Sequence, residues 1–157
     1  MTERSCGPCT ACCEGWLMSR HIEMSPGQPC QHCTRQGCAI YDERPEDPCR
    51  TFVCGWLQAD SPLPEQLRPD LSGVVVMLDR KWRGRRIIKA TPAGWTIPPD
   101  TLEKLMALAR ERSLPLIYLE NLQKDGRYIG YRQMGYGPPE FVQAVQRSIG
   151  PSDIRVI

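Results

Sequence analysis

Cysteine is missing from most of this chain. Residues 55–157 contain none, whereas nine lie between residues 6 and 54. The chain also lacks an apolar run close to the ~20 residues of a membrane span, and no apolar segment of the kind found in export signals precedes the first cysteine. We therefore expect a protein with no membrane anchor that resides in the cytoplasm.

The motifs of common enzyme classes are also missing. The sequence has no Ser-His-Asp order, paired-carboxylate signature, phosphate loop or glycine-rich nucleotide fingerprint. It has only two histidines, His21 and His32, so Cys-His catalysis by a free thiol would have to use one of them. The sequence therefore defines no catalytic residue and leaves open whether the protein is an enzyme.

The concentration of cysteine indicates a metal site rather than disulfides. The cytosol keeps dithiols reduced, and an odd number of cysteines cannot pair completely. A C-x-x-C turn presents two sulfurs to one ion, and Cys6/Cys9 and Cys30/Cys33 are two such turns. We predict that all nine cysteines bind metal, namely Cys6, Cys9, Cys12, Cys13, Cys30, Cys33, Cys38, Cys49 and Cys54.

Two kinds of metal centre compete. Cys6, Cys9 and Cys12 have the spacing of the run that binds a [4Fe-4S] cluster, but Cys13 adjoins this run and no Cys-Pro follows it. Nine thiolates exceed the eight terminal ligands of two tetrahedral sites, so several zinc ions with bridging sulfurs would use them all. The lack of a redox or nucleotide motif favours the zinc cluster, and the [4Fe-4S] cluster is the alternative.

Residues beside the cysteines have expected roles as well. Cys12 and Cys13 are neighbours whose side chains point in different directions, so we expect them to serve two metals or to bridge between them. We expect His32 to lie near the ligands rather than among them. Arg50 is expected to donate hydrogen bonds to thiolates and to offset their charge.

The cysteine pattern resembles that of a known family. Cys6-x-x-Cys9-x-x-Cys12-Cys13 is followed by Cys30-x-x-Cys33, Gly37-Cys38-Ala39-Ile40-Tyr41, Arg44-Pro45, Cys49-Arg50 and Phe52-Val53-Cys54-x-Trp56-Leu57. This arrangement is similar to the bacterial family of zinc- or iron-chelating proteins named for its CxxCxxCC motif, over about residues 5–57. The resemblance implies a cysteine metal centre. Larger proteins with a similar module include flagellin lysine methylases, so an enzymatic role remains open by analogy.

The composition divides the chain into three parts. Residues 1–58 form a loop-rich cysteine module, and residues 59–72 form a proline-rich connection. Residues 73–157 form a small α+β part that we expect to pack on the module as one domain. Residues 1–60 carry a net charge of −3 and residues 61–157 one of +5, so the metal-bearing face should be acidic and the rear mildly basic.

The rear has the order strand, strand, helix, repeated once. Residues 74–78 and 86–90 are predicted to form one hairpin, and residues 116–119 and 128–132 a second, with a loop longer than the ideal. Each hairpin precedes a helix. Asp100 is the predicted N-cap of the first.

The second helix is predicted to follow Pro138-Pro139, to carry Phe141, Val145 and Ile149 on one face, and to end at Gly150-Pro151. In the front, alternation over residues 16–24 predicts a strand. The predicted fold class is therefore α+β, a loop-rich cysteine metal module followed by a sheet of two hairpins with two helices.

A basic run suggests a further function. Residues 80–86 contain five cations around Trp82, which could hold phosphates while the ring stacks on a base. The run is predicted at a hairpin tip, where exposed charge is ordinary, and the whole chain carries only +2. The metal-binding protein is thus the leading interpretation, an iron–sulfur enzyme or electron carrier the second, and a zinc-stabilised nucleic-acid-binding module the third.

Overall fold

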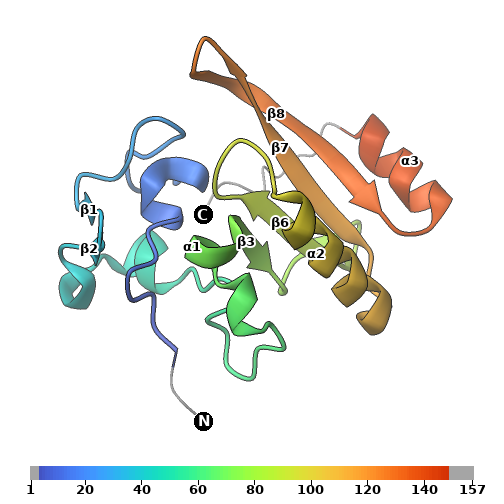
Figure 1. Ribbon diagram of the computed structural model, residues 1–157, viewed down its shortest axis with the longest axis horizontal. Helices are drawn as coiled ribbons and strands as arrows, with labels where there is room; N and C mark the ends of the chain where they lie inside the picture. Colours follow the sequence, from blue (N-terminus) through green and yellow to red (C-terminus); the bar gives the residue numbers. More distant parts are fainter. Residues whose placement is uncertain (1–3, 149–157) are drawn as a thin grey trace.

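The computed structural model describes residues 4–148 and has an α+β fold, as predicted (Figure 1). Its centre is a four-stranded sheet in the order β3-β6-β7-β8. The strands are β3 (Val74–Met77), β6 (Ile88–Pro92), β7 (Leu116–Lys124) and β8 (Arg127–Tyr136). Helix α2 (Pro99–Arg112) connects β6 to β7, and α3 (Pro139–Arg147) follows β8. The predicted order of strands and helices in the rear is confirmed.

Both predicted hairpins are present, and a parallel pair joins them. β3 and β6 are antiparallel, and a small hairpin of β4 (Lys81–Trp82) and β5 (Arg85–Arg86) lies between them in the chain. β7 and β8 are also antiparallel. β6 and β7 run parallel, which is possible because the helical crossover through α2 returns the chain to the same end of the sheet.

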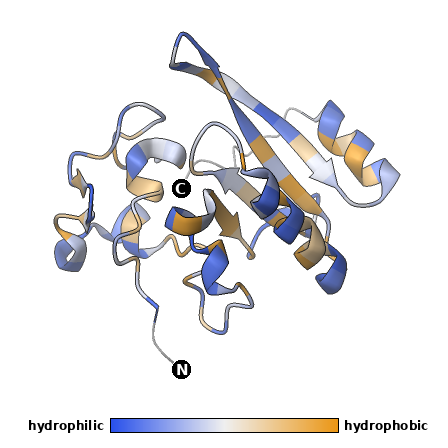
Figure 2. Ribbon diagram, in the orientation of Figure 1, coloured by the Kyte–Doolittle hydropathy of each residue, from blue (hydrophilic) through white to orange (hydrophobic). Residues whose placement is uncertain are grey.

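The sheet is covered on both faces. Leu116 belongs to the core that β7 shares with α2 and the cysteine module, whereas the next residue, Ile117, packs with Phe141 and Val145 of α3. This division follows from the period of two along a strand, which sends successive side chains to opposite faces. Figure 2 shows the apolar residues concentrated on the strands between these layers. No helix within residues 4–148 has the length and apolar character needed to cross a bilayer.

The β7–β8 hairpin is tighter than predicted. Only Asp125 and Gly126 connect the strands, and their φ angles of 53° and 79° are those of a two-residue turn of type I′. The expected long loop was wrong because both strands continue well beyond the β-branched and aromatic runs that identified them. Charged residues such as Lys124 and Arg127 extend the ladder to the turn.

The start of α2 also differs from its prediction. Pro98 occupies the N-cap position and Asp100 lies in the first turn, without a capping hydrogen bond. The fixed φ of Pro99 suits the first helical position, and the carboxylate of Asp100 is still favourable beside the positive end of the helix dipole. For α3, Phe141 and Val145 are buried as predicted, while Ile149 and Gly150-Pro151 lie outside the described residues.

The cysteine module consists of short elements and loops. They are η1 (Cys12–Trp16), β1 (Cys33–Thr34), β2 (Gly37–Cys38), η2 (Tyr41–Glu43) and η3 (Glu46–Arg50). The strand predicted over residues 16–24 was wrong, since the described segment 17–24 contains none. Its apolar residues instead make separate tertiary contacts: Leu17 is fully buried in the core, and the Trp16 ring meets the Trp95 ring edge-on at 5.4 Å.

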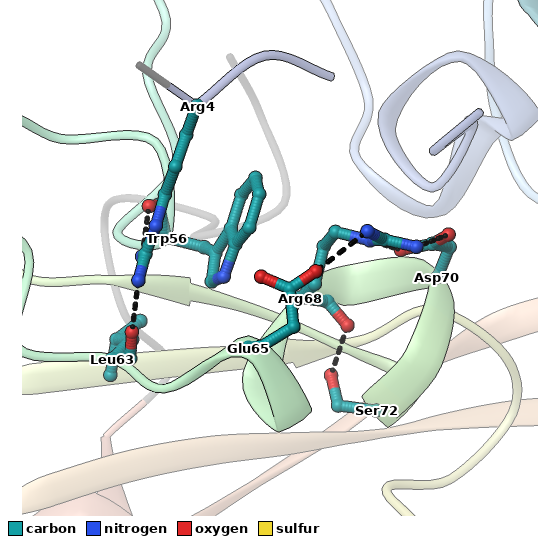
Figure 3. A network of polar contacts seen from close by, with 7 residues as sticks. All are labelled: Arg4, Trp56, Leu63, Glu65, Arg68, Asp70 and Ser72. Atoms are coloured by element: carbon teal, nitrogen blue, oxygen red, sulfur yellow. Dashed lines mark hydrogen bonds and ion pairs between the residues drawn. The ribbon is translucent and has the colours of Figure 1, made fainter. Parts of the chain in front are cut away.

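The connection carries two short helical turns, η4 (Glu65–Leu67) and α1 (Pro69–Ser72). Arg4 bridges the module to this connection (Figure 3). Its guanidinium donates to the carbonyl oxygens of Trp56 and Leu63 at 2.8 and 2.9 Å, and it lies 4.6 Å from the centroid of the Trp56 ring. Arg68 lies 5.9 Å from the same ring and forms ion pairs with Glu65 and Asp70.

Arg4→Ala should lower the free energy of unfolding by about 1–3 kcal/mol, because it removes two charge-assisted hydrogen bonds and a cation–π contact. Arg4→Lys should recover part of the loss, since an ammonium keeps the charge but cannot reproduce the guanidinium fork. The urea midpoint measures both effects, and Arg20→Ala, at an exposed arginine of the same module, is the control. Equal midpoints for Arg4→Ala and Arg20→Ala would contradict the bridging role of Arg4.

Candidate metal centre

Eight of the nine cysteines line one cavity of about 120 Å³. They are Cys6, Cys9, Cys12, Cys13, Cys30, Cys38, Cys49 and Cys54. The ninth, Cys33, lies against the group, with its Sγ 2.9 Å from the Sγ of Cys13. All nine are free thiols. Segments separated by more than forty residues therefore bring their sulfurs to one place, as the sequence predicted.

The rest of the cavity wall is mainly apolar. The side chains include Ile22, Met24, Ile40, Tyr41, Pro45, Pro48, Phe52, Trp56, Leu57 and Pro69. Four of these, Tyr41, Phe52, Trp56 and Leu57, follow or precede a cysteine motif in the sequence. Such a wall limits access of water to the thiols and lowers the local dielectric, which strengthens both repulsion between charges and attraction to a bound cation.

Backbone hydrogen bonds shape the first cysteine loop, residues 6–13. The Cys9 amide donates to the Cys6 carbonyl at 2.9 Å and closes the turn of the first C-x-x-C pair. The Cys30 amide donates to the Cys13 carbonyl at 2.7 Å. This second bond fixes the start of the next cysteine segment against the end of the first.

The knuckle loop, residues 30–38, is a miniature hairpin. Cys33 and Cys38 are paired across β1 and β2, and the Thr34 hydroxyl donates to the Gly37 carbonyl at 2.6 Å. Gly37 has a φ of +128°, and a Cβ at this position would lie 2.7 Å from the Gly7 carbonyl oxygen. Only glycine therefore lets the knuckle loop approach the first cysteine loop so closely.

Burial opposes the ionisation of several of these thiols. It raises the pKa of Cys9 from 9.0 to about 11, although the backbone amides of Ala11 and Asp70 oppose the shift by donating to the sulfur. Burial and then repulsion from Cys54, Cys9 and Cys6 raise the pKa of Cys12 well above its ordinary value. Ionising several of these thiols together is consequently unfavourable unless a cation compensates their charge.

The adjacent residues Cys12 and Cys13 face different partners. Burial also raises the pKa of Cys13, whose Sγ lies 2.9 Å from that of Cys33 in the knuckle loop. The cysteines thus form two groups. The core-facing thiols are Cys9, Cys12 and Cys54, which pack at the hydrophobic core, and Cys6, which the first C-x-x-C turn joins to Cys9. The knuckle thiols are Cys13, Cys33 and Cys38, which are joined by the Cys13–Cys33 contact and the Cys33–Cys38 strand pair, together with Cys30, which the second C-x-x-C turn joins to Cys33, and Cys49.

Arginines beside the thiols include Arg44 and Arg68, which both line the cavity. Arg50, the residue expected in this role, is exposed and donates to the carbonyl oxygens of Arg44 and Asp42 at 3.0 and 2.6 Å. Arg44 lines the cavity, with its guanidinium 3.9 Å from the Tyr41 ring centroid. Partial burial acts against its charge, but Tyr41, Cys6 and Cys49 outweigh this and raise its pKa. Arg44 stands in the Arg-Pro pair of the motif, where the sequence indicated only a turn.

Two polar atoms at the cavity have no partner. Arg44 Nε and Trp56 Nε1 are buried N–H donors without a hydrogen bond in the described structure, and both residues line the cavity. A buried donor left unpaired costs about 1–3 kcal/mol. Thiolate or inorganic sulfur of a bound metal centre would accept such bonds, so these donors fit an anionic metal–sulfur group.

The spacing of the sulfurs also bears on the kind of centre. A single zinc ion with Zn–S bonds of about 2.3 Å brings its sulfurs to roughly 3.8 Å from one another. Among residues 4–148, no three His, Cys, Asp or Glu side chains are gathered closely enough to hold one metal ion in their present positions. The thiols thus surround a cavity and do not converge on one position where a single ion could contact three of them. The number and type of donors fit a metal centre, and the hollow fits one with several metal atoms.

The remaining predicted residues lie at different distances from the cavity. His32 is part of its wall, and its backbone amide donates to the Cys30 sulfur at 3.5 Å. His21 is exposed. In the basic hairpin, Trp82 packs edge-on against Phe141 at 5.3 Å, and the Arg83 guanidinium lies 4.5 Å from its ring. The ring expected to stack on a base therefore already has two partners.

Replacing Gly37 tests the contact between the two loops. Gly37→Ala should separate the knuckle loop from the first cysteine loop and increase the rate at which the metal-free thiols react with Ellman's reagent, because the new Cβ meets the Gly7 carbonyl oxygen. Gly27→Ala is a matched control, since Gly27 also has a positive φ, +87°, but nothing lies within 4 Å of the position that its Cβ would take. Equal thiol reactivity in the two variants would contradict this contact.

Comparison of the chain with family models, curated proteins and solved structures gives no match. The cysteine pattern and the cavity that it forms are therefore the basis on which the function must be argued.

Proposed function

We propose that this protein binds a multinuclear metal centre through cysteine thiolates in the cavity of its cysteine module. The observation that carries this proposal is the convergence of eight cysteines from distant segments on one mainly apolar cavity. Buried thiols without a metal gain little from being gathered, because each loses solvation and repels the others when ionised. Bound metal ions reverse this balance, since thiolate ligation contributes directly to the free energy of folding.

Two kinds of metal centre are candidates, a zinc cluster and an iron–sulfur cluster. A zinc cluster with bridging thiolates uses the full set of nine cysteines, in keeping with the absence of redox motifs from the sequence. The hollow favours a [4Fe-4S] cluster as the second candidate, because inorganic sulfide would fill space between sulfurs that stand apart. The second candidate would make the protein an electron carrier or an iron–sulfur enzyme. Free thiols and a cysteine metal centre both suit a reducing compartment such as the cytoplasm.

Metal and sulfide analysis of anaerobically purified protein tests the proposal. We expect at least two metal ions per chain, with either zinc and no colour, or iron with stoichiometric sulfide and absorption near ~400 nm. Cys12→Ser combined with Cys13→Ser should remove most of the metal. His21→Ala is the control, because His21 is an exposed residue of a ligating type in the same module. Wild-type protein that binds neither zinc nor iron with sulfide would overturn the proposed function.

A further inference from the structure

We propose that the cavity holds two separate metal positions, one bound by the core-facing thiols and one by the knuckle thiols. This inference rests on the proposed metal binding and specifies how the cysteines are shared. It assigns the adjacent residues Cys12 and Cys13 to different metals, so a single peptide bond joins the two positions.

The contacts of the two adjacent cysteines carry this assignment. Cys13 Sγ is 2.9 Å from Cys33 Sγ, and Cys33 is paired with Cys38 across the knuckle hairpin. Cys12 instead packs against the hydrophobic core that contains Cys54, together with Cys9. The two side chains therefore enter groups on different sides of the first cysteine loop, and one tetrahedral ion could not take both with the partners that each has.

The number of sulfurs in each group supports separate positions. Four core-facing thiols equal the ligand count of a closed zinc site and of a [4Fe-4S] cluster. The five knuckle thiols exceed it by one. Each group thus contains at least four sulfurs, which would draw together on binding, since no three ligand-type side chains within residues 4–148 are close enough to hold one ion in their present positions.

The supporting structure of the two groups differs. Three of the four core-facing thiols pack against the core that includes β3, β6 and α2. The knuckle thiols stand on short elements, namely the five-residue turns η1 (Cys13) and η3 (Cys49) and the two-residue strands β1 (Cys33) and β2 (Cys38), with Cys30 between them in the chain. Segments with few buried apolar contacts open at lower free energy than a packed core. The knuckle position should therefore exchange its metal while the core-facing position retains it.

Release of metal to a chelator tests this inference on the intact chain. Anaerobically purified protein, or protein reloaded with zinc, is treated with excess EDTA, and the metal that stays with the protein is measured over time. We expect two phases in the wild type, each accounting for about half of the metal ions if one ion occupies each position. Release of all the metal in one phase would overturn the inference.

Two variants identify the phases. Cys38→Ser should abolish the fast phase and leave the slow one, whereas Cys54→Ser should abolish the slow phase. Loss of all metal from Cys38→Ser, with a far-UV circular dichroism spectrum like that of the wild type, would show that the positions are not separate. If a variant unfolds, the two-phase result for the wild type still decides. A wild-type protein that binds no metal overturns the proposed function itself, an outcome distinct from single-phase release.

Discussion

The burial of thiols, which opposes their ionisation, is the constraint on which the cysteine module depends. Eight cysteines share a mainly apolar cavity, where burial raises the pKa of Cys9 to about 11 and that of Cys12 and Cys13 further from its ordinary value. For these three buried thiols, the neutral form and a cation-bound form are favoured over a free anion. The short helical turns and two-residue strands of the module add little stability of their own, so what occupies the cavity decides how firmly the loops are held.

The rear of the protein supplies the rigid side of the centre. Cys54 is 6% exposed and packs with Trp56 in the same core as β3, and the amide of Gly55 donates to the Val76 carbonyl. At the connection, the amide of Asp70 donates to the Cys9 sulfur while the carboxylate of Asp70 is held by Arg68. One of these hydrogen bonds joins the residue next to Cys54 to the sheet, and another joins the connection to the sulfur of Cys9 in the first cysteine loop.

Local patterns in the sequence predicted the features that depend on residues close together in the chain, such as turns, strands and helices. The C-x-x-C spacings predicted thiols paired on tight turns, and the alternating and helical runs predicted the four strands of the sheet and the two helices α2 and α3, but not the small hairpin of β4 and β5. The strand over residues 16–24 failed because its alternation arises from separate contacts, such as that of Trp16 with Trp95, and not from a ladder. Sequence proximity to cysteine could not distinguish Arg50 from Arg44, because only the turn between them determines which guanidinium reaches the cavity. The parallel pairing of β6 with β7 and the contribution of Asp70 depend on contacts between distant segments, which no local pattern records.

The adjacency of Cys12 and Cys13 has a mechanical consequence. Both lie at the start of η1, so a movement of the backbone at one residue also moves the other. The carbonyl of Cys13 also accepts the hydrogen bond that places Cys30 and the knuckle loop. A movement of the Cys13 backbone would therefore reach the knuckle loop through this hydrogen bond and the core-facing thiols through one peptide bond. The two groups of thiols are in this way joined through the shortest connection that a polypeptide allows.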